Sequence, residues 1–238
     1  MAKYRQKYGQ FVVEGRKAVE EVFHSGWEVL GIWCTLEFAE KYNPPYSYEV
    51  MDETESKKLT AFETSPGVIA WVKTPENRNL NTECDFILSL DGISDPGNLG
   101  TIIRLADWYG LNQILVSNDT VDAFNPKVLA ASMGSFLRVN VVYGDLVSEI
   151  QQLQKTFGVT GVMGADLQGD SIYNLEIPSK VMLVMGSESH GLRTEIRNVL
   201  GRYVNIPRQG LAESLNAGIA TAILMDNILQ KMQNIAQR

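Results

Sequence analysis

The sequence predicts an α/β protein built around a mostly parallel sheet. In the second half of the chain, short apolar runs alternate with segments of helical spacing, which is the pattern of strands and helices in such a sheet. Three of these runs also stop at polar turns that contain glycine. The chain has 238 residues, of which 45% are hydrophobic, so it can fill the core that this fold requires.

The first part of the chain predicts a small α/β unit. Apolar residues in Arg16–Ser25 share one helical face, and Gly26 ends that segment. The polar segment Lys73–Thr82 contains a proline and is typical of a linker, so we expect domains at residues 1–75 and 82–238. In the first domain, strands are expected at 11–15, 29–34, 48–50 and 67–72, and helices at 16–25, 38–42 and 52–62.

The second part of the chain predicts a regular alternation of strands and helices. Strands are expected at Phe86–Leu90, Gln113–Val116, Val139–Val142, Val159–Ala165, Val181–Met185 and Tyr203–Ile206. Helices are expected at Gly100–Trp108, Lys127–Ser132, Leu146–Thr156, Arg193–Val199 and Leu215–Met232. Apolar strands separated by helices indicate a sheet that is covered on both faces.

Three polar turns follow strands of this sheet. The first, Asn98–Arg104, follows Phe86–Leu90, and the second, Met185–Leu192, follows Val181–Val184. The third, Asn205–Asn216, runs into the last helical segment. Ligands of open α/β sheets bind at the carboxyl ends of the strands. We therefore expect the three turns to build one site.

Two other interpretations of these turns follow from the residues alone. In the first, they are strand–helix connections, with Gly100 opening one helix and Ser187, Ser189, Ser214 or Asn216 capping another. In the second, they belong to a dinucleotide-binding oxidoreductase, because Asp119 stands where a ribose-binding carboxylate would lie. The glycines at 92, 97 and 100 do not form Gly-x-Gly-x-x-Gly, which argues against that class.

The charge of the chain argues against nucleic-acid binding by bulk attraction. Its net charge is −7, whereas such binding depends on lysine and arginine at the phosphates. A local basic cluster near the N-terminus is either a solvated surface or an RNA-facing edge. It consists of Lys3, Arg5, Lys7, Arg16 and Lys17, interleaved with Tyr4 and Tyr8.

The composition also argues against a metal site or a membrane segment. Cys34 and Cys84 are far apart and only two histidines are present, so we expect free, buried thiols and no metal. No apolar run is long enough to span a bilayer, and the N-terminus lacks the apolar stretch of a signal peptide. We therefore expect a cytoplasmic protein without membrane contact.

Taken together, the three turns resemble the motifs of the SpoU (TrmH-type) branch of the SPOUT RNA methyltransferases. The family patterns are Asn-x-Gly-x-x-x-Arg, Gly-x-Glu-x-x-Gly-Leu and Ile-Pro-x-x-Gly-x-x-Glu-Ser-Leu-Asn, and all three occur here in this order. The resemblance implies a SPOUT α/β-knot domain with a deep C-terminal trefoil knot. It also implies a preceding L30e-like domain that binds the RNA substrate, whose landmarks match Phe11–Gly15 and Thr64–Ala70.

The resemblance further implies a reaction and a set of site residues. The reaction is methylation of a ribose 2′-hydroxyl in tRNA or rRNA by S-adenosylmethionine, which leaves S-adenosylhomocysteine, and the family acts as a homodimer through its last helix. The implied catalytic residues are Arg104, Asn98, Glu188, Ser214 and Asn216. The implied cofactor-binding residues are Met185, Gly186, Ser187, Gly191, Ile206, Pro207, Gly210, Ser214 and Leu215. Lys127 and Ser132 match a further segment near the active site.

Arg104 is the residue with the most specific chemical hypothesis. A free guanidinium has a pKa of roughly 13, so it is a poor general base and is expected to act through charge. Its planar fork can bind the adjacent phosphate and stabilise the developing 2′-alkoxide. His190 stands at a variable family position, and Arg208 replaces a methionine that is common there. A non-catalytic RNA-binding module of the same fold is the main rival interpretation.

Overall fold

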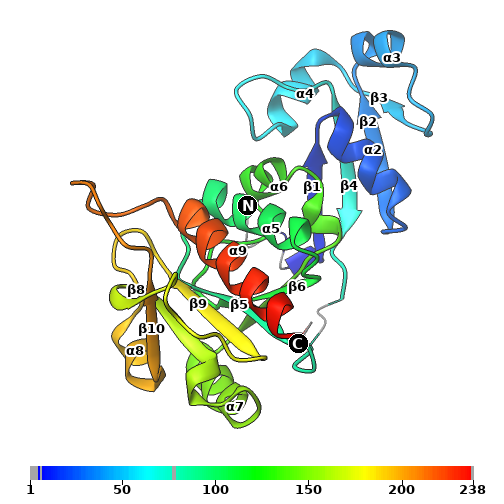
Figure 1. The fold of residues 1–238 in the computed structure, drawn as a ribbon. Helices are drawn as coiled ribbons and strands as arrows, with labels where there is room; N and C mark the ends of the chain where they lie inside the picture. Colours follow the sequence, from blue (N-terminus) through cyan, green and yellow to red (C-terminus); the bar gives the residue numbers. More distant parts are fainter. Residues whose placement is uncertain (1–4, 6, 77–78, 237–238) are drawn as a thin grey trace.

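The computed structural model describes residue 5, residues 7–76 and residues 79–236. Within these ranges the chain forms two sheets, one in each half, and each sheet carries its own helices (Figure 1). The predicted strands and helices are present in the predicted order, with shifts of a few residues at their ends.

The first sheet has the strand order β1-β4-β2-β3. Strand β4 pairs with β1 and β2 in antiparallel orientation, and β2 pairs with β3 in parallel. Local chemistry sets the helix ends: Thr35 Oγ1 accepts from Phe38 N at 3.2 Å, and Asp52 and Glu55 form a capping box. The bounds are β1 (Gln10–Glu14), α2 (Arg16–His24), β2 (Val29–Cys34), α3 (Leu36–Tyr42), β3 (Glu49–Val50), α4 (Glu53–Leu59) and β4 (Val68–Lys73).

The second sheet has the strand order β10-β8-β9-β5-β6-β7, and all of its pairs are parallel. Its strands are β5 (Phe86–Asp91), β6 (Gln113–Ser117), β7 (Asn140–Gly144), β8 (Val162–Ser171), β9 (Val181–Gly186) and β10 (Arg202–Asn205). Its α-helices are α5 (Pro96–Trp108), α6 (Pro126–Ser132), α7 (Leu146–Phe157), α8 (Thr194–Val199) and α9 (Ala217–Ala236), and two short 3₁₀ turns are η1 (Ser135–Leu137) and η2 (Val159–Gly161).

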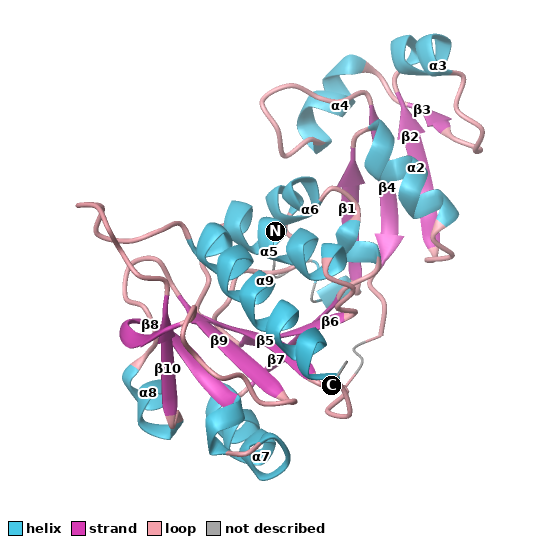
Figure 2. Ribbon diagram, viewed as in Figure 1, coloured by secondary structure: helices cyan, strands magenta, loops and turns pink. Residues whose placement is uncertain are grey.

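Helices cover both faces of the second sheet (Figure 2). On one face, Leu88 and Leu90 of β5 share a core with residues of α5 and α9. On the other face, Ile87 packs in a core with α7 and α8. Because successive side chains of a strand point to opposite faces, both cores draw on the same apolar run, as the sequence pattern predicts.

Two element boundaries differ from the prediction for local reasons. Helix α9 begins at Ala217 instead of Leu215, because the Asn216 side chain accepts hydrogen bonds from Gly218 N at 3.0 Å and Ile219 N at 3.3 Å. Strand β8 begins after the 3₁₀ turn η2 and extends to Ser171, with a register shift where it pairs with β10.

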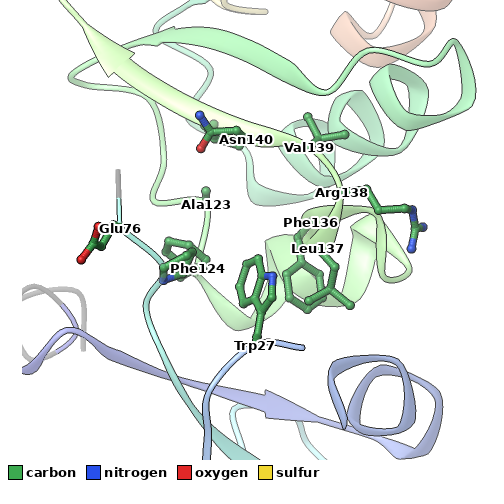
Figure 3. Close-up of a pocket in the computed structure, with 11 residues that line it drawn as sticks. Trp27, Glu76, Ala123, Phe124, Phe136, Leu137, Arg138, Val139 and Asn140 are labelled. Carbon is green, nitrogen blue, oxygen red and sulfur yellow. The ribbon is translucent and has the colours of Figure 1, made fainter. Parts of the chain in front are cut away.

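The two halves of the molecule share an apolar junction. Leu129 and Phe136 of the second half belong to the same buried cluster as Phe11, and the ring of Phe124 lies 4.5 Å from that of Phe11. Figure 3 shows the hollow at this junction, which Trp27, Phe124 and Phe136 help to line and which contains none of the predicted site residues.

One member of the predicted basic cluster belongs to this junction. Arg5 donates to Asp122 Oδ2 through Nε at 2.8 Å and Nη2 at 2.5 Å, and its side chain is largely buried. The prediction of a solvated or RNA-facing Arg5 is therefore wrong, because the guanidinium is used to join the two halves. Arg16 and Lys17 are exposed, whereas Lys3 and Tyr4 lie outside the described residues.

Candidate functional site

The first and second motifs leave the sheet at the same edge. Asp91, the last residue of β5, pairs with Gly186, the last residue of β9, so both strands end side by side. The Asn98 segment follows β5 and the Glu188 segment follows β9. This arrangement brings two distant parts of the sequence together at one edge of the sheet, as expected for the first two turns.

The first motif forms the beginning of α5. Asp95 caps the helix by accepting from Asn98 N at 2.8 Å, and Pro96 occupies the first turn. Helix α5 therefore begins before Gly100, which was expected to open it. Gly100 instead packs against α6, where a Cβ would lie 2.5 Å from Ala131 Cβ. This glycine permits close approach of two helices.

The second motif forms a narrow loop. Ser187 N donates to Gly191 O at 3.1 Å and Gly191 N donates to Ser187 O at 2.9 Å. Gly191 has a φ of 64°, which favours glycine, and a Cβ on Gly186 would overlap the backbone of Gly191. The interpretation of Ser187 or Ser189 as a helix cap is wrong, because α8 begins at Thr194 and has no side-chain cap.

A hydrogen-bond network joins all three motifs. Asn98 Nδ2 donates to Glu188 Oε1, and Asn216 Nδ2 donates to Asn98 Oδ1 at 2.7 Å. Asn98 thus uses its donor toward the second motif and its acceptor toward the third. Three of the five predicted catalytic residues meet here, although they are separated by 90 and 118 positions in the sequence.

The third motif is an open loop between β10 and α9. Residues 207–216 are exposed, and Figure 1 shows this orange segment projecting beyond the helices. Leu211 is 99% exposed, and Arg208 Nη1 donates to Ala212 O at 3.2 Å within the loop. Within the described ranges, Ser214 makes no hydrogen bond and does not join the Asn98 network, and neither Ser214 nor Leu215 lies in the expected helix.

Arg104 lies on α5 six positions after Asn98 and is exposed. Among the described residues it has no hydrogen-bond or ion-pair partner. Its guanidinium fork is therefore free to bind an anion from solution. Lys127 is also exposed, at the beginning of α6. Ser132 is fully buried and donates to Leu129 O at 2.8 Å, so it serves the helix and not the site.

Sequence reasoning missed two charged residues beside this edge of the sheet, Asp91 and Arg193. Asp91 is buried and binds Arg193, and Arg193 Nη1 lies 3.4 Å from Asp119 Oδ2. A hydrogen bond from Ser117 lowers the pKa of Asp119, so this carboxylate stays ionised. The sequence feature that could have identified this pair is Asp91, a carboxylate that directly follows the predicted buried strand Phe86–Leu90.

Two further predictions concern residues outside this site. We expected no metal, and we expected both cysteines to be free and buried. No cluster of potential metal ligands occurs within the described ranges. Cys34 and Cys84 are free thiols, and Cys34 is buried as expected, whereas Cys84 is only half-buried. Burial raises the pKa of Cys34 to about 11. The helices that the structure describes are too short or too polar to cross a membrane.

The fold and the joined motifs agree with the matches to protein families. Residues 85–226 match the model of the SpoU rRNA Methylase family, and residues 1–72 match the MRM3-like substrate binding domain. The chain belongs to the SpoU rRNA methylase family, as the three motifs predict.

Similar proteins cover nearly the whole chain. The 23S rRNA (guanosine(2553)-2′-O)-methyltransferase RlmP of Bacillus subtilis is 33% identical over 94% of this chain and 90% of its own length. A TrmH-family RNA methyltransferase structure from Porphyromonas gingivalis has a TM-score of 0.81 and 32% identity over 95% of this chain and 92% of that one. The SpoU methyltransferase AviRb from Streptomyces viridochromogenes, solved with AdoMet, has a TM-score of 0.83 and 25% identity over 100% of this chain and 95% of its own. These matches confirm the predicted SPOUT-type α/β fold.

Proposed function

We propose that this chain methylates a ribose 2′-hydroxyl of 23S ribosomal RNA, with Asn98, Glu188 and Asn216 forming the polar centre of its active site. The enzyme is an S-adenosylmethionine-dependent RNA 2′-O-methyltransferase of the SpoU family. The observation that carries the proposed site is the hydrogen-bond network through Asn98. The ribosomal substrate rests on the names of relatives from Bacillus and Streptomyces, which methylate 23S rRNA. A cytoplasmic location accords with that substrate.

The loops around the network fit S-adenosylmethionine. Gly186 and Gly191 let the second motif close into its narrow loop, since a side chain on Gly186 would overlap the Gly191 backbone and Gly191 has a positive φ. Leu211 and Leu215 are exposed apolar side chains on the third loop and suit an adenine ring. We assign cofactor binding to the residues predicted from the sequence: Met185, Gly186, Ser187, Gly191, Ile206, Pro207, Gly210, Ser214 and Leu215. The bound cofactor supplies a reactive methyl group on sulfur.

Arg104 acts on the nucleophile in this proposal. Its free fork binds the phosphate next to the reacting ribose and stabilises negative charge as the 2′-oxygen attacks. The new bond joins the 2′-oxygen to the methyl carbon while the carbon–sulfur bond breaks, and the hydroxyl proton leaves to phosphate or water. The Asn98 network holds the second and third motifs at the fixed distance that in-line attack requires.

The proposed function also assigns a role to each half of the chain and includes a second subunit. Residues 1–75 form the proposed RNA-binding domain and residues 82–238 the catalytic domain. We also propose a homodimer through α5 and α9, which are joined by a hydrogen bond from Tyr109 to Asp226 of 3.1 Å. Trp108 on α5 is 83% exposed and Ile219 on α9 is 55% exposed, so each helix presents a large apolar side chain that a second subunit could cover.

The role of Arg104 is tested by comparing Arg104→Lys with Arg104→Ala. Loss of a group that stabilises charge in an active site lowers turnover on the order of 10²–10³-fold. The methylation rate of Arg104→Ala should therefore be lower than that of the wild type by about this factor. Arg104→Lys keeps the charge but loses the fork, so it should recover only part of the rate. The measurement is single-turnover methylation of 23S rRNA fragments, with S-adenosylhomocysteine affinity as the control that neither variant should change. Near-normal turnover of Arg104→Lys would exclude bidentate binding.

A calorimetric titration separates the proposal from its rivals. The wild type should bind S-adenosylhomocysteine saturably and should not bind NAD. Binding of NAD alone would establish a nucleotide-dependent oxidoreductase. Cofactor binding without methyl transfer to any ribosomal RNA fragment would favour a non-catalytic RNA-binding module.

A further inference from the structure

A buried carboxylate at the end of β5 holds the loop of the second motif. Asp91 has a fully buried side chain. Its Oδ2 accepts from Arg193 N at 2.8 Å, and its Oδ1 accepts from Arg193 Nε at 2.6 Å and lies 2.6 Å from Arg193 Nη2. Both carboxylate oxygens are therefore bound by one residue that lies 102 positions away in the sequence.

The loop 187–193 is fixed at both of its ends through Asp91. Before the loop, Gly186 is the β-sheet partner of Asp91. At the end of the loop, Arg193 binds the Asp91 carboxylate through its backbone and its side chain. Glu188, which accepts from Asn98, lies between these two anchor points. Glu188 thus lies in a loop whose two ends both contact Asp91.

We propose that Asp91 and Arg193 are positioning residues that hold Glu188 against Asn98; the two residues are called the latch below. This inference rests on the proposed function, in which the Asn98 network is the polar centre of the site. A buried ion pair gains little stability over an apolar pair, whereas a charge-assisted fork fixes the orientation of its partners. We therefore expect the latch to fix the position of the loop and to add little to the stability of the fold.

The other charges around Arg193 favour Asp91 as its main partner. Asp119 lies 3.4 Å from Arg193 Nη1 and Glu195 lies 3.7 Å from Nε, and both side chains are more than half exposed. Water screens these two pairs, whereas the buried Asp91 pair is screened much less. When the Asp91 charge is removed, Arg193 keeps partners at the surface, and the end of the loop is free to move outward with it.

The latch is tested in the complete protein without cofactor, by hydrogen exchange of the peptide that covers residues 186–194. Arg193→Lys keeps the charge and loses the fork, and Asp91→Asn keeps the size and loses the charge. The matched control is Arg138→Lys, which breaks a similar fork to Asp107 at the opposite end of α5. Arg193→Lys also serves as the test if Asp91→Asn fails to fold.

In both latch variants, the amides of residues 187–192 should exchange about tenfold faster or more, because local opening becomes easier. In Arg138→Lys the same amides should keep their rate. Affinity for S-adenosylhomocysteine should fall about 10–100-fold in Arg193→Lys, as for other groups that orient a binding residue. Unchanged exchange in Arg193→Lys, or faster exchange with unchanged affinity, would overturn the latch. Absence of cofactor binding by the wild type would count against the proposed function, and unchanged exchange in Arg193→Lys would in that case still overturn the latch.

Discussion

At the scale of single residues, the site depends on an asparagine that bonds in two directions. The Asn98 side chain donates to a carboxylate of the second motif and accepts from an amide of the third. An aspartate of the same shape can accept from Asn216 but cannot donate to Glu188. The amide is therefore the chemical group that this position requires.

The requirement for an amide at position 98 is tested by exchanging the amide of Asn98 with the carboxylate of Glu188. Asn98→Asp places two carboxylates in contact at an exposed position, so it should lower stability by about 0.5–1 kcal/mol and loosen cofactor binding. Adding Glu188→Gln restores a donor–acceptor pair, with the amide now on the second motif. The double variant should regain most of the lost melting temperature and S-adenosylhomocysteine affinity. Equal losses in the single and double variants would contradict the proposed hydrogen bond.

At the scale of elements, charged pairs fix the far end of α5. Asp107 accepts from Ser135 Oγ at 2.7 Å and from Arg138 Nη2 at 2.7 Å, which joins α5 to the turn η1. Hydrogen bonds from the Arg138 guanidinium hold the pKa of Asp107 below its usual range, and the hydrogen bond from Ser135 adds to this effect.

The lowered pKa of Asp107 predicts a stability change with pH. A carboxylate whose pKa is lower in the folded state stabilises the fold above its unfolded pKa of about 3.9 and loses this effect as pH falls through the folded value. Asp107→Asn should therefore cost about 1 kcal/mol at pH 7, and its difference from the wild type should shrink below about pH 4. Urea unfolding across this range measures both values. Glu28→Gln, which removes an exposed pair with Lys73, should show no comparable pH-dependent loss.

At the scale of the whole molecule, the two halves pack as one body at their junction. The buried cluster that contains Phe11 also contains Leu129 and Phe136, and Arg5 binds Asp122 across the same boundary. A shared core of this kind couples the unfolding of its two sides. The orientation of the proposed RNA-binding domain relative to the catalytic site is then set by packing.

Shortening one side chain at the junction tests whether the two halves unfold together. Phe124 contacts the rings of Phe11 and Trp27, so Phe124→Ala should destabilise the protein by about 2–3 kcal/mol. Calorimetry should show one unfolding transition that moves as a unit to lower temperature. Two transitions, of which only one moves in the variant, would show that the halves unfold independently.

The proposed dimer is tested at its most exposed aromatic residue. Trp108→Asp replaces the exposed indole of α5 with a charge, and burying that charge in an interface is costly, so the variant should be a monomer. Light scattering after size-exclusion chromatography measures the mass. Val159→Asp changes an exposed apolar residue of η2 and should leave the mass of the wild type unchanged. A monomeric wild type would contradict the proposal.

The strands and helices were largely predictable because their residues carry the pattern locally. The buried strand predicted at Phe86–Leu90 follows from its apolar spacing. The start of α5 was predicted at Gly100, four residues too late, although Asp95 and Pro96 are the local capping signals. The boundary of α9 was less predictable, because both Ser214 and Asn216 are good caps and only Asn216 bonds to the first turn. Gly100 was misinterpreted, since its role in packing against α6 involves a partner outside its own segment.

The α/β class, the family and the three motifs could be predicted from the amino-acid sequence, because each depends on residues that are contiguous in the chain. Tertiary structure alone decided which side chains of those motifs touch. The pairs Asn98–Glu188, Asn98–Asn216 and Asp91–Arg193 join residues about 90 to 118 positions apart. Such pairs depend on the order of strands in the sheet, which brings β5 and β9 side by side, and not on any local pattern.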